Sequence, residues 1–178
     1  MLAVWMDVFE AIRGRRSVRE FRSTPVKEKD LEKILDAARL APSAGHCQPL
    51  ELVVVKDQTT KQGLARAALG QMFIAEAPVS IVVCANIPRT SRRYGRRGEE
   101  LYCIQDTAAA VQNILLAAYA LGYATCWVGA FDDDAVAGVI KAPAGVRSVA
   151  IIPLGRPAEE PSPPQRIPLS KIIHEDKF

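Results

Sequence analysis

The segment QDTAAAVQNILLAAYALGYATCWVGAF, residues 105–131, is central to the fold of this chain. From Thr107 to Phe131 it carries no charged side chain, and aspartates bound it on both sides. An uncharged run of this length would suffice to span a bilayer, but four polar or glycine positions interrupt it. Its apolar residues recur at helical spacing on more than one face. We therefore predict a buried helix over residues 101–122, central to a domain or facing a second subunit, followed by a strand or loop.

Strands and helices alternate on both sides of this segment. β-Branched runs predict three strands covered on both faces, at residues 50–57, 77–86 and 146–155. Apolar residues at helical spacing predict helices at residues 6–13, 23–42, 61–69 and 132–140. Ser23 or Thr24 is expected to cap the second of these helices. This alternation is typical of an α/β or α+β protein, and 178 residues fit one domain.

The composition limits the class of protein. A net charge of +3 from 23 basic and 20 acidic side chains permits anionic ligands without implying nucleic acid. The four cysteines are widely spaced and include no Cys-x-x-Cys pair, which argues against a zinc site and a disulfide framework. Asp7 and Glu10 come too early for a signal peptide in residues 1–16. We expect a cytoplasmic protein without a metal site.

Two polar segments stand apart from the predicted core. Residues 88–98, PRTSRRYGRRG, read as a polar loop with five arginines in nine residues. The proline-rich tail beyond Gly155 has too few apolar residues to form a core, so it predicts an extended arm that lies on another surface.

Residues 15–21, RRSVREF, place Arg15, Arg16 and Arg19 around Ser17. Guanidinium and hydroxyl groups bind phosphates and carboxylates through strong, charge-assisted hydrogen bonds. A solvated basic surface would give the same short pattern, so these residues alone leave both interpretations open.

Common catalytic and nucleotide-binding motifs are missing from the sequence. There is no His-Glu-x-x-His or Gly-x-Ser-x-Gly, and the only histidines are His46 and His174. Neither Gly-x-Gly-x-x-Gly nor a P-loop occurs. Few titratable groups and several arginines favour a protein that leaves its chemistry to a cofactor.

Four ordered segments together resemble the FMN-dependent nitroreductase family, over residues 9–174. They are IRGRRSVREF at 12–21, APSAGHCQPLELVVV at 41–55, the segment at 105–131, and IIPLGRPAEE with PPQRIP between 151 and 168. The resemblance implies an α+β, nitroreductase-like three-layer fold with a central, mostly antiparallel sheet flanked by helices. It also implies a single FMN-binding domain over 1–178, a long central helix at a subunit interface, and an arm, 155–178, that wraps the partner subunit.

The function implied by the resemblance is that of a flavoprotein oxidoreductase. Hydride would pass in ping-pong fashion from NAD(P)H through bound FMN to an acceptor such as a nitroaromatic or a quinone. The protein would be a homodimer with FMN at the subunit interface and a small-molecule acceptor, without a nucleic-acid or membrane partner. No side chain is assigned as catalytic, because the flavin carries the chemistry.

The resemblance also assigns the cofactor contacts. Arg15 and Ser17 would hold the phosphate and ribityl chain, Arg166 would be a second phosphate ligand, and Arg16 and Arg19 would lie nearby, Arg19 at the pyrimidine edge of the ring. Gln71 would pair with the flavin pyrimidine. The backbone amides of Gly129 and Ala130 would donate to the reactive flavin nitrogen and its neighbouring carbonyl, while Trp127 and Val128 shape the far side of the ring. Pro42, Ser43, Ala44 and His46 would reach the flavin from the partner subunit.

Three positions depart from the family pattern. His46 stands where the family usually has asparagine, and Leu50 where it has an aromatic residue. Pro164 replaces a lysine found in some relatives, so that contact is either lost or replaced by Arg156 or Arg16.

Alternative functions are compatible with the same residues. Within the family these are flavin fragmentation and reductive dehalogenation, the latter disfavoured because the segment 88–101 is short and arginine-rich and offers only Tyr94. A flavin carrier without turnover would have the same sequence features. Outside the family, residues 89–97 would suit a basic nucleic-acid-binding module. The sequence does not distinguish NADH from NADPH or identify the acceptor.

Overall fold

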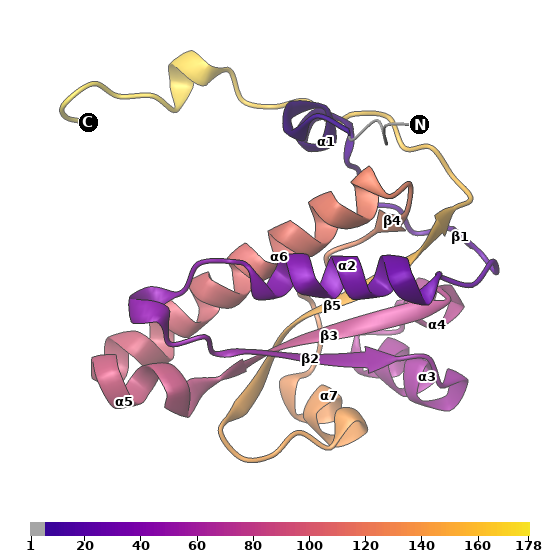
Figure 1. Cartoon of the computed structure of the whole chain (residues 1–178), viewed down its shortest axis with the longest axis horizontal. Coiled ribbons are helices and arrows are strands. Elements are labelled where there is room, and N and C mark those ends of the chain that lie inside the picture. Colours follow the sequence, from indigo (N-terminus) through magenta and orange to yellow (C-terminus); the bar gives the residue numbers. More distant parts are fainter. Residues whose placement is uncertain (1–5) are drawn as a thin grey trace.

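The structure is a computed structural model that describes residues 6–178. The expectation that the chain lacks an export signal rests partly on residues 1–5, which lie outside this range. The predicted central helix is present as α6 (Cys103–Ala120), preceded by one π-helical turn at Gly98–Tyr102. It runs diagonally across the sheet, beside α2 (Glu28–Arg39) (Figure 1).

Within residues 6–178 the sheet contains five strands, and every pairing between these strands is antiparallel. Its members are β1 (Phe21–Arg22), β2 (Leu50–Val55), β3 (Val79–Asn86), β4 (Ala124–Thr125) and β5 (Val146–Pro157). The order is β1-β5-β3-β2, and β4 also pairs with β5. The three predicted strands correspond to β2, β3 and β5, so the antiparallel α+β fold expected from the family resemblance is confirmed.

Helices cover both faces of this sheet and create three layers. The central strand β3 is buried along nearly its whole length because its alternate side chains enter two separate cores. On one face, Ile81 and Val83 pack with α2 and α6. On the other, Val82 and Cys84 pack with α3 (Gln58–Ala67), α4 (Phe73–Glu76) and α7 (Asp133–Ile140). The core therefore requires all three layers.

Helix α2 begins later than predicted. Its N-cap is Lys27, and neither Ser23 nor Thr24 caps it. Instead the Tyr123 hydroxyl accepts a hydrogen bond from the Lys27 N–H over 3.2 Å and donates to Asp30 over 3.0 Å. A side chain distant in sequence thus replaces the local capping signal. The first helix, α1 (Val8–Gly14), has the capping box of Asp7 and Glu10.

The arginine-rich segment is a helix, which corrects the prediction of a polar loop. Helix α5 spans Ile87–Arg97, with a break at Gly95, whose φ is 53°. Pro88 lies in its first turn, where backbone N–H groups have no acceptor within the helix, so the N–H that proline lacks is not missed and proline is favoured. Arginine is also a good helix former. The prediction of a loop was wrong because it relied on the polar character of these residues and not on their helix propensity.

The last residues form an extended arm beyond the sheet (Figure 1). Apart from one 3-10 turn at Leu169–Lys171, residues 160–178 have no regular structure and are mostly exposed. Large apolar side chains stay exposed on this arm and on α1: Val8, Phe9, Ile12, Ile167, Leu169, Ile172, Ile173 and Phe178. Among residues 6–178, no helix is long and apolar enough to cross a membrane.

Candidate functional site

The arginines of the RRSVREF segment lie in a cavity with an arginine of the arm. The segment leaves α1 and pairs with β4 through a bridge between Ser17 and Thr125, and Val18 N–H donates to the Thr125 carbonyl over 3.0 Å. The resulting cavity measures about 240 Å³. It is lined by Arg15, Arg16, Ser17, Arg19, Pro161, Ser162, Pro164 and Arg166. Two segments from opposite ends of the chain thus form one basic site.

These four arginines have no carboxylate partner among the described residues. None of the five ion pairs found in residues 6–178 includes them. The nearby Glu159 carboxylate is used differently, because it accepts hydrogen bonds from the backbone N–H groups of Arg19 and Glu20. Burial, followed by the charges of Arg166 and Arg16, lowers the pKa of Arg15. Like charges held together without a counter-ion favour binding of an anion.

Side-chain contacts link the lining of this cavity to the segment after β4. The Cys126 thiol lies beside Ser17 and Arg19, and its burial raises its pKa. Arg19 lies over the ring of Phe73 in α4, with 5.9 Å between the guanidinium carbon and the ring centroid. The same α3–α4 region carries Gln71, whose amide nitrogen donates to the Ala68 carbonyl over 2.9 Å and to the Ala130 carbonyl over 3.1 Å. These contacts connect the basic cavity to residues 126–130.

The segment 127–130 is anchored at Val128 and exposed at Trp127, Gly129 and Ala130. Val128 exchanges two hydrogen bonds with Ile151 of β5, at 3.0 and 2.9 Å, which fixes the segment on the sheet. Gly129 and Ala130 are exposed, and neither N–H group donates a hydrogen bond within residues 6–178. Trp127 is also exposed. Free amides at one end and clustered guanidinium groups at the other suit a ligand with a hydrogen-bond-accepting ring and an anionic tail.

The remaining predicted contacts, Pro42, Ser43, Ala44 and His46, lie at the other end of α6. Ala44 N–H donates to the Asp106 carboxylate over 3.0 Å, in the first turns of α6. The basic cavity is instead joined to β4, which follows the end of α6. From Asp106 to the end of α6 at Ala120, the helix separates the two groups by about 21 Å. Within one chain, the structure does not bring them together.

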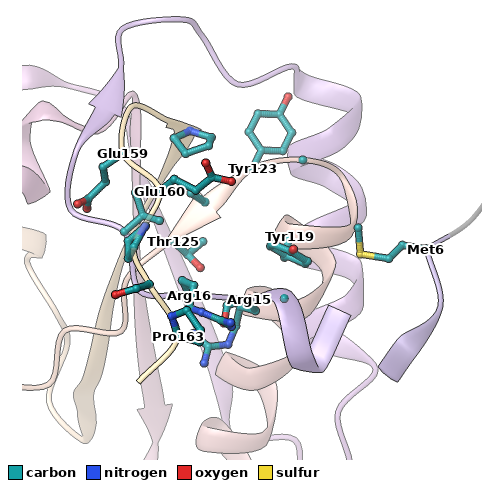
Figure 2. A pocket seen from close by; sticks show the side chains of 16 residues that line it. Met6, Arg15, Arg16, Tyr119, Tyr123, Thr125, Glu159, Glu160 and Pro163 are labelled. Carbon is teal, nitrogen blue, oxygen red and sulfur yellow. The ribbon is translucent and has the colours of Figure 1, made fainter. Parts of the chain in front are cut away.

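A larger cavity of about 690 Å³ adjoins the basic one. Figure 2 shows Tyr119 and Tyr123 on one side, Glu159 and Glu160 of the arm on the other, and Arg15 at one end. Sequence reasoning did not identify the two tyrosines or the two glutamates, because their proximity depends on where the arm lies. Within residues 6–178, no group of three or more His, Cys, Asp or Glu side chains could hold a metal ion.

A sequence model of the nitroreductase family matches residues 12–78 and 69–156. The chain belongs to the nitroreductase family. Among its relatives, the NADH dehydrogenase of Thermus thermophilus is 34% identical, and the match covers 94% of this chain and 95% of that protein. An FMN reductase [NAD(P)H] of Bacillus subtilis is 24% identical over 97% of this chain and 74% of its own length. A crystal structure of a nitroreductase family protein from Clostridium novyi superposes with a TM-score of 0.79, at 31% identity, over 86% of this chain and 87% of that one.

The departures from the nitroreductase family pattern can now be located. Arg16 lines the basic cavity beside Pro164, while its guanidinium donates to the Arg13 and Arg15 carbonyls at 2.6 and 2.9 Å. Arg156 does not line this cavity. It donates to the Leu121 and Gly122 carbonyls at the end of α6.

The other two departures lie at the opposite end of α6. His46 is exposed, has a left-handed φ of 58°, and makes no side-chain hydrogen bond within the part of the chain that the structure describes. Leu50 is the first residue of β2.

Proposed function

We propose that this chain is an NAD(P)H-dependent FMN oxidoreductase. Membership of the nitroreductase family supports this proposal, together with the names of two relatives, an NADH dehydrogenase and an FMN reductase [NAD(P)H]. The observation that carries it is the basic cavity, in which Arg15, Arg16, Arg19 and Arg166 meet without a carboxylate partner from residues 6–178. A phosphate would supply the missing negative charge.

The residues around this cavity fit FMN. Arg15, Ser17 and Arg166 would hold its phosphate and ribityl chain, with Arg16 beside them. Arg19, Gln71 and the free amides of Gly129 and Ala130 would face the polar edge of its ring, and Trp127 and Val128 would border it. The exposed N–H groups at 129 and 130 are free to donate, and the ring nitrogens and carbonyls of a flavin can accept their hydrogen bonds.

Bound FMN would supply the hydride chemistry. The chain itself would contribute orientation and charge, because guanidinium groups stabilise a phosphate and any negative charge that develops on the ring. We infer that NAD(P)H and the oxidised acceptor use one open face in turn, as in a ping-pong mechanism, with nitroaromatics and quinones as acceptors. Orientation over a bound cofactor then replaces side-chain acid–base catalysis.

The site is proposed to be shared by two subunits of a cytoplasmic homodimer. Pro42, Ser43, Ala44 and His46 lie across α6 from the basic cavity, so they would complete the site of the partner subunit rather than their own. The exposed apolar side chains of α1 and of the arm, residues 155–178, support such an interface, because a partner would remove them from water. The whole chain, residues 1–178, would then act as one FMN-binding domain.

The test is the visible spectrum of the purified protein under nitrogen, with NADH and then NADPH added. We expect flavin bands that bleach with one or both donors and return when a nitroaromatic or quinone is added. Flavin bands that persist with both donors would contradict the oxidoreductase and leave a carrier. A protein that neither contains FMN nor takes it up would contradict the flavin site itself.

A further inference from the structure

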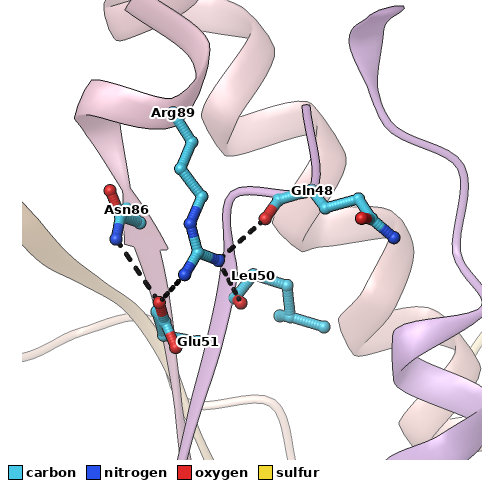
Figure 3. Close-up of polar contacts among 5 residues, drawn as sticks. All are labelled: Gln48, Leu50, Glu51, Asn86 and Arg89. Atoms are coloured by element: carbon cyan, nitrogen blue, oxygen red, sulfur yellow. Dashed lines mark hydrogen bonds and ion pairs between the residues drawn. The ribbon is translucent and has the colours of Figure 1, made fainter. Parts of the chain in front are cut away.

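Helix α5 is attached to the loop at residues 42–49 by arginine side chains. One guanidinium nitrogen of Arg89 donates to the Gln48 carbonyl over 3.0 Å and lies 3.5 Å from the Leu50 carbonyl. Its other terminal nitrogen pairs with the Glu51 carboxylate over 2.5 Å. Figure 3 shows this fork between α5 and the start of β2, with Asn86 bound to the same carboxylate over 3.3 Å. Glu51 therefore orients the guanidinium that holds the loop.

Three further contacts hold the same loop. Arg93 donates to the Gly45 carbonyl over 2.8 Å, and the backbone N–H of Asn86 donates to the Pro49 carbonyl over 2.7 Å. From α6, the Asp106 carboxylate accepts the Ala44 N–H over 3.0 Å. The backbone of the loop is thus held by α5 and Asn86 and also by α6.

The loop needs this support because its backbone is strained. Gly45, His46 and Gln48 have φ values of 52°, 58° and 50°. The left-handed region is open to glycine but costs energy for other residues, so His46 and Gln48 require contacts that enforce it. The Arg89 contact falls on Gln48 itself, one of the two non-glycine residues concerned.

We propose that Arg89 is a positioning residue of the flavin site. By holding the Gln48 carbonyl against α5, it fixes the conformation in which the loop reaches the flavin of the partner subunit. This inference rests on the proposed function, since it needs the loop to contact a flavin. Arg89 does not itself line the basic cavity.

Two other arginines of α5 bind residues of the helical turn that follows it. Arg96 pairs with Glu100 over 2.7 Å, and Arg97 donates to the Tyr102 hydroxyl over 2.9 Å. Arg92 is exposed and makes no hydrogen bond or ion pair within residues 6–178. Four of the five arginines of α5 thus make contacts within the fold, and Arg92 provides a matched control on the same helix.

The experiment compares Arg89→Ala with Arg92→Ala by titrating the flavin-free dimer with FMN and with riboflavin, following flavin fluorescence. Loss of the Arg89 contacts should weaken binding of both flavins by about tenfold, the effect expected for a lost charge-assisted hydrogen bond. The ratio of the two dissociation constants should stay unchanged, because riboflavin lacks only the phosphate, which the basic cavity holds. Arg92→Ala should bind both flavins like the unmodified protein.

Two further variants keep the test decisive if Arg89→Ala does not fold. Arg89→Lys preserves the charge beside Glu51 without the two-nitrogen fork of a guanidinium, and Glu51→Gln removes the charge that orients Arg89. Each variant should weaken binding of both flavins by a smaller factor than Arg89→Ala does. Equal affinities in these variants and in Arg92→Ala would overturn the inference. An unmodified protein that binds neither flavin would instead overturn the proposed function.

Discussion

Arg166 offers the sharpest test of the basic cavity, because its replacement should affect flavin binding and apoprotein stability differently. In the absence of an anion, its charge opposes that of Arg15, whose pKa it lowers. Arg166 is exposed on the arm, so Arg166→Ala leaves no buried void. Removing it relieves repulsion between like charges, and the apoprotein should be as stable as before or slightly more stable.

Binding of FMN should respond in the opposite direction. A hydrogen bond to a charged group contributes about 1.5–3 kcal/mol, and each 1.4 kcal/mol corresponds to about tenfold in the dissociation constant. Arg166→Ala should therefore raise the dissociation constant for FMN by about 10- to 100-fold. Riboflavin, which has no phosphate, should bind with nearly unchanged affinity. High salt should reduce the difference between the variant and the unmodified protein, because it screens exposed charges.

The assay combines a fluorescence titration with FMN and riboflavin and a thermal melt of the apoprotein. Lys171→Ala is the matched control, since Lys171 is an exposed cation of the same arm that does not line the basic cavity. An FMN affinity of Arg166→Ala equal to that of Lys171→Ala would refute the phosphate assignment. An apoprotein destabilised by more than about 1 kcal/mol would show that Arg166 stabilises the fold instead.

Three further predictions concern residues outside the basic cavity. Burial raises the pKa of Asp106. The stability that this shift contributes is therefore present below the pKa of Asp106 in the unfolded chain, and it is lost as pH rises through the pKa in the folded chain. Asp106→Asn, which still accepts the Ala44 N–H, should raise the free energy of unfolding at neutral pH and flatten the pH dependence of that free energy in urea unfolding. Gly98→Ala would place a Cβ 2.6 Å from the Thr90 carbonyl oxygen, and we expect a loss of about 1–3 kcal/mol in the same assay; an unchanged midpoint would show that α5 shifts freely. Arg156→Ala should cost about 0.5–1.5 kcal/mol of stability by removing two hydrogen bonds to carbonyls after the end of α6, while FMN affinity stays unchanged; weakened FMN binding would place Arg156 in the site.

The sequence predicted those elements whose pattern is local. Strands β3 and β5 and helix α6 follow directly from β-branched runs and helical spacing. The predicted start of α2 was wrong because the hydroxyl of Tyr123, far away in sequence, accepts the hydrogen bond of the Lys27 N–H. Helix α5 was missed because its arginines read as a polar loop, and their partners, such as Glu51, become visible only in three dimensions.

The residues of the candidate site likewise differ in how far local sequence predicts them. Arg15 and Ser17 form a recognisable local motif, whereas the assignment of Arg166 came from the family resemblance. The structure brings these residues into one cavity. No local signal marks Asp106 or Arg89 as supports of the loop, because each acts through a backbone group that the fold carries to it.

The central claim is that each flavin site combines the basic cavity of one chain with the loop of another. It can be tested by pairing two defective chains, Arg166→Ala/Arg15→Ala and Pro42→Glu, in a heterodimer purified through two different tags. Each variant alone should fail to retain FMN. In the heterodimer, the intact cavity of one chain meets the intact loop of the other, so we predict one FMN per dimer by absorbance. A heterodimer as empty as its two parents would contradict a site shared between subunits.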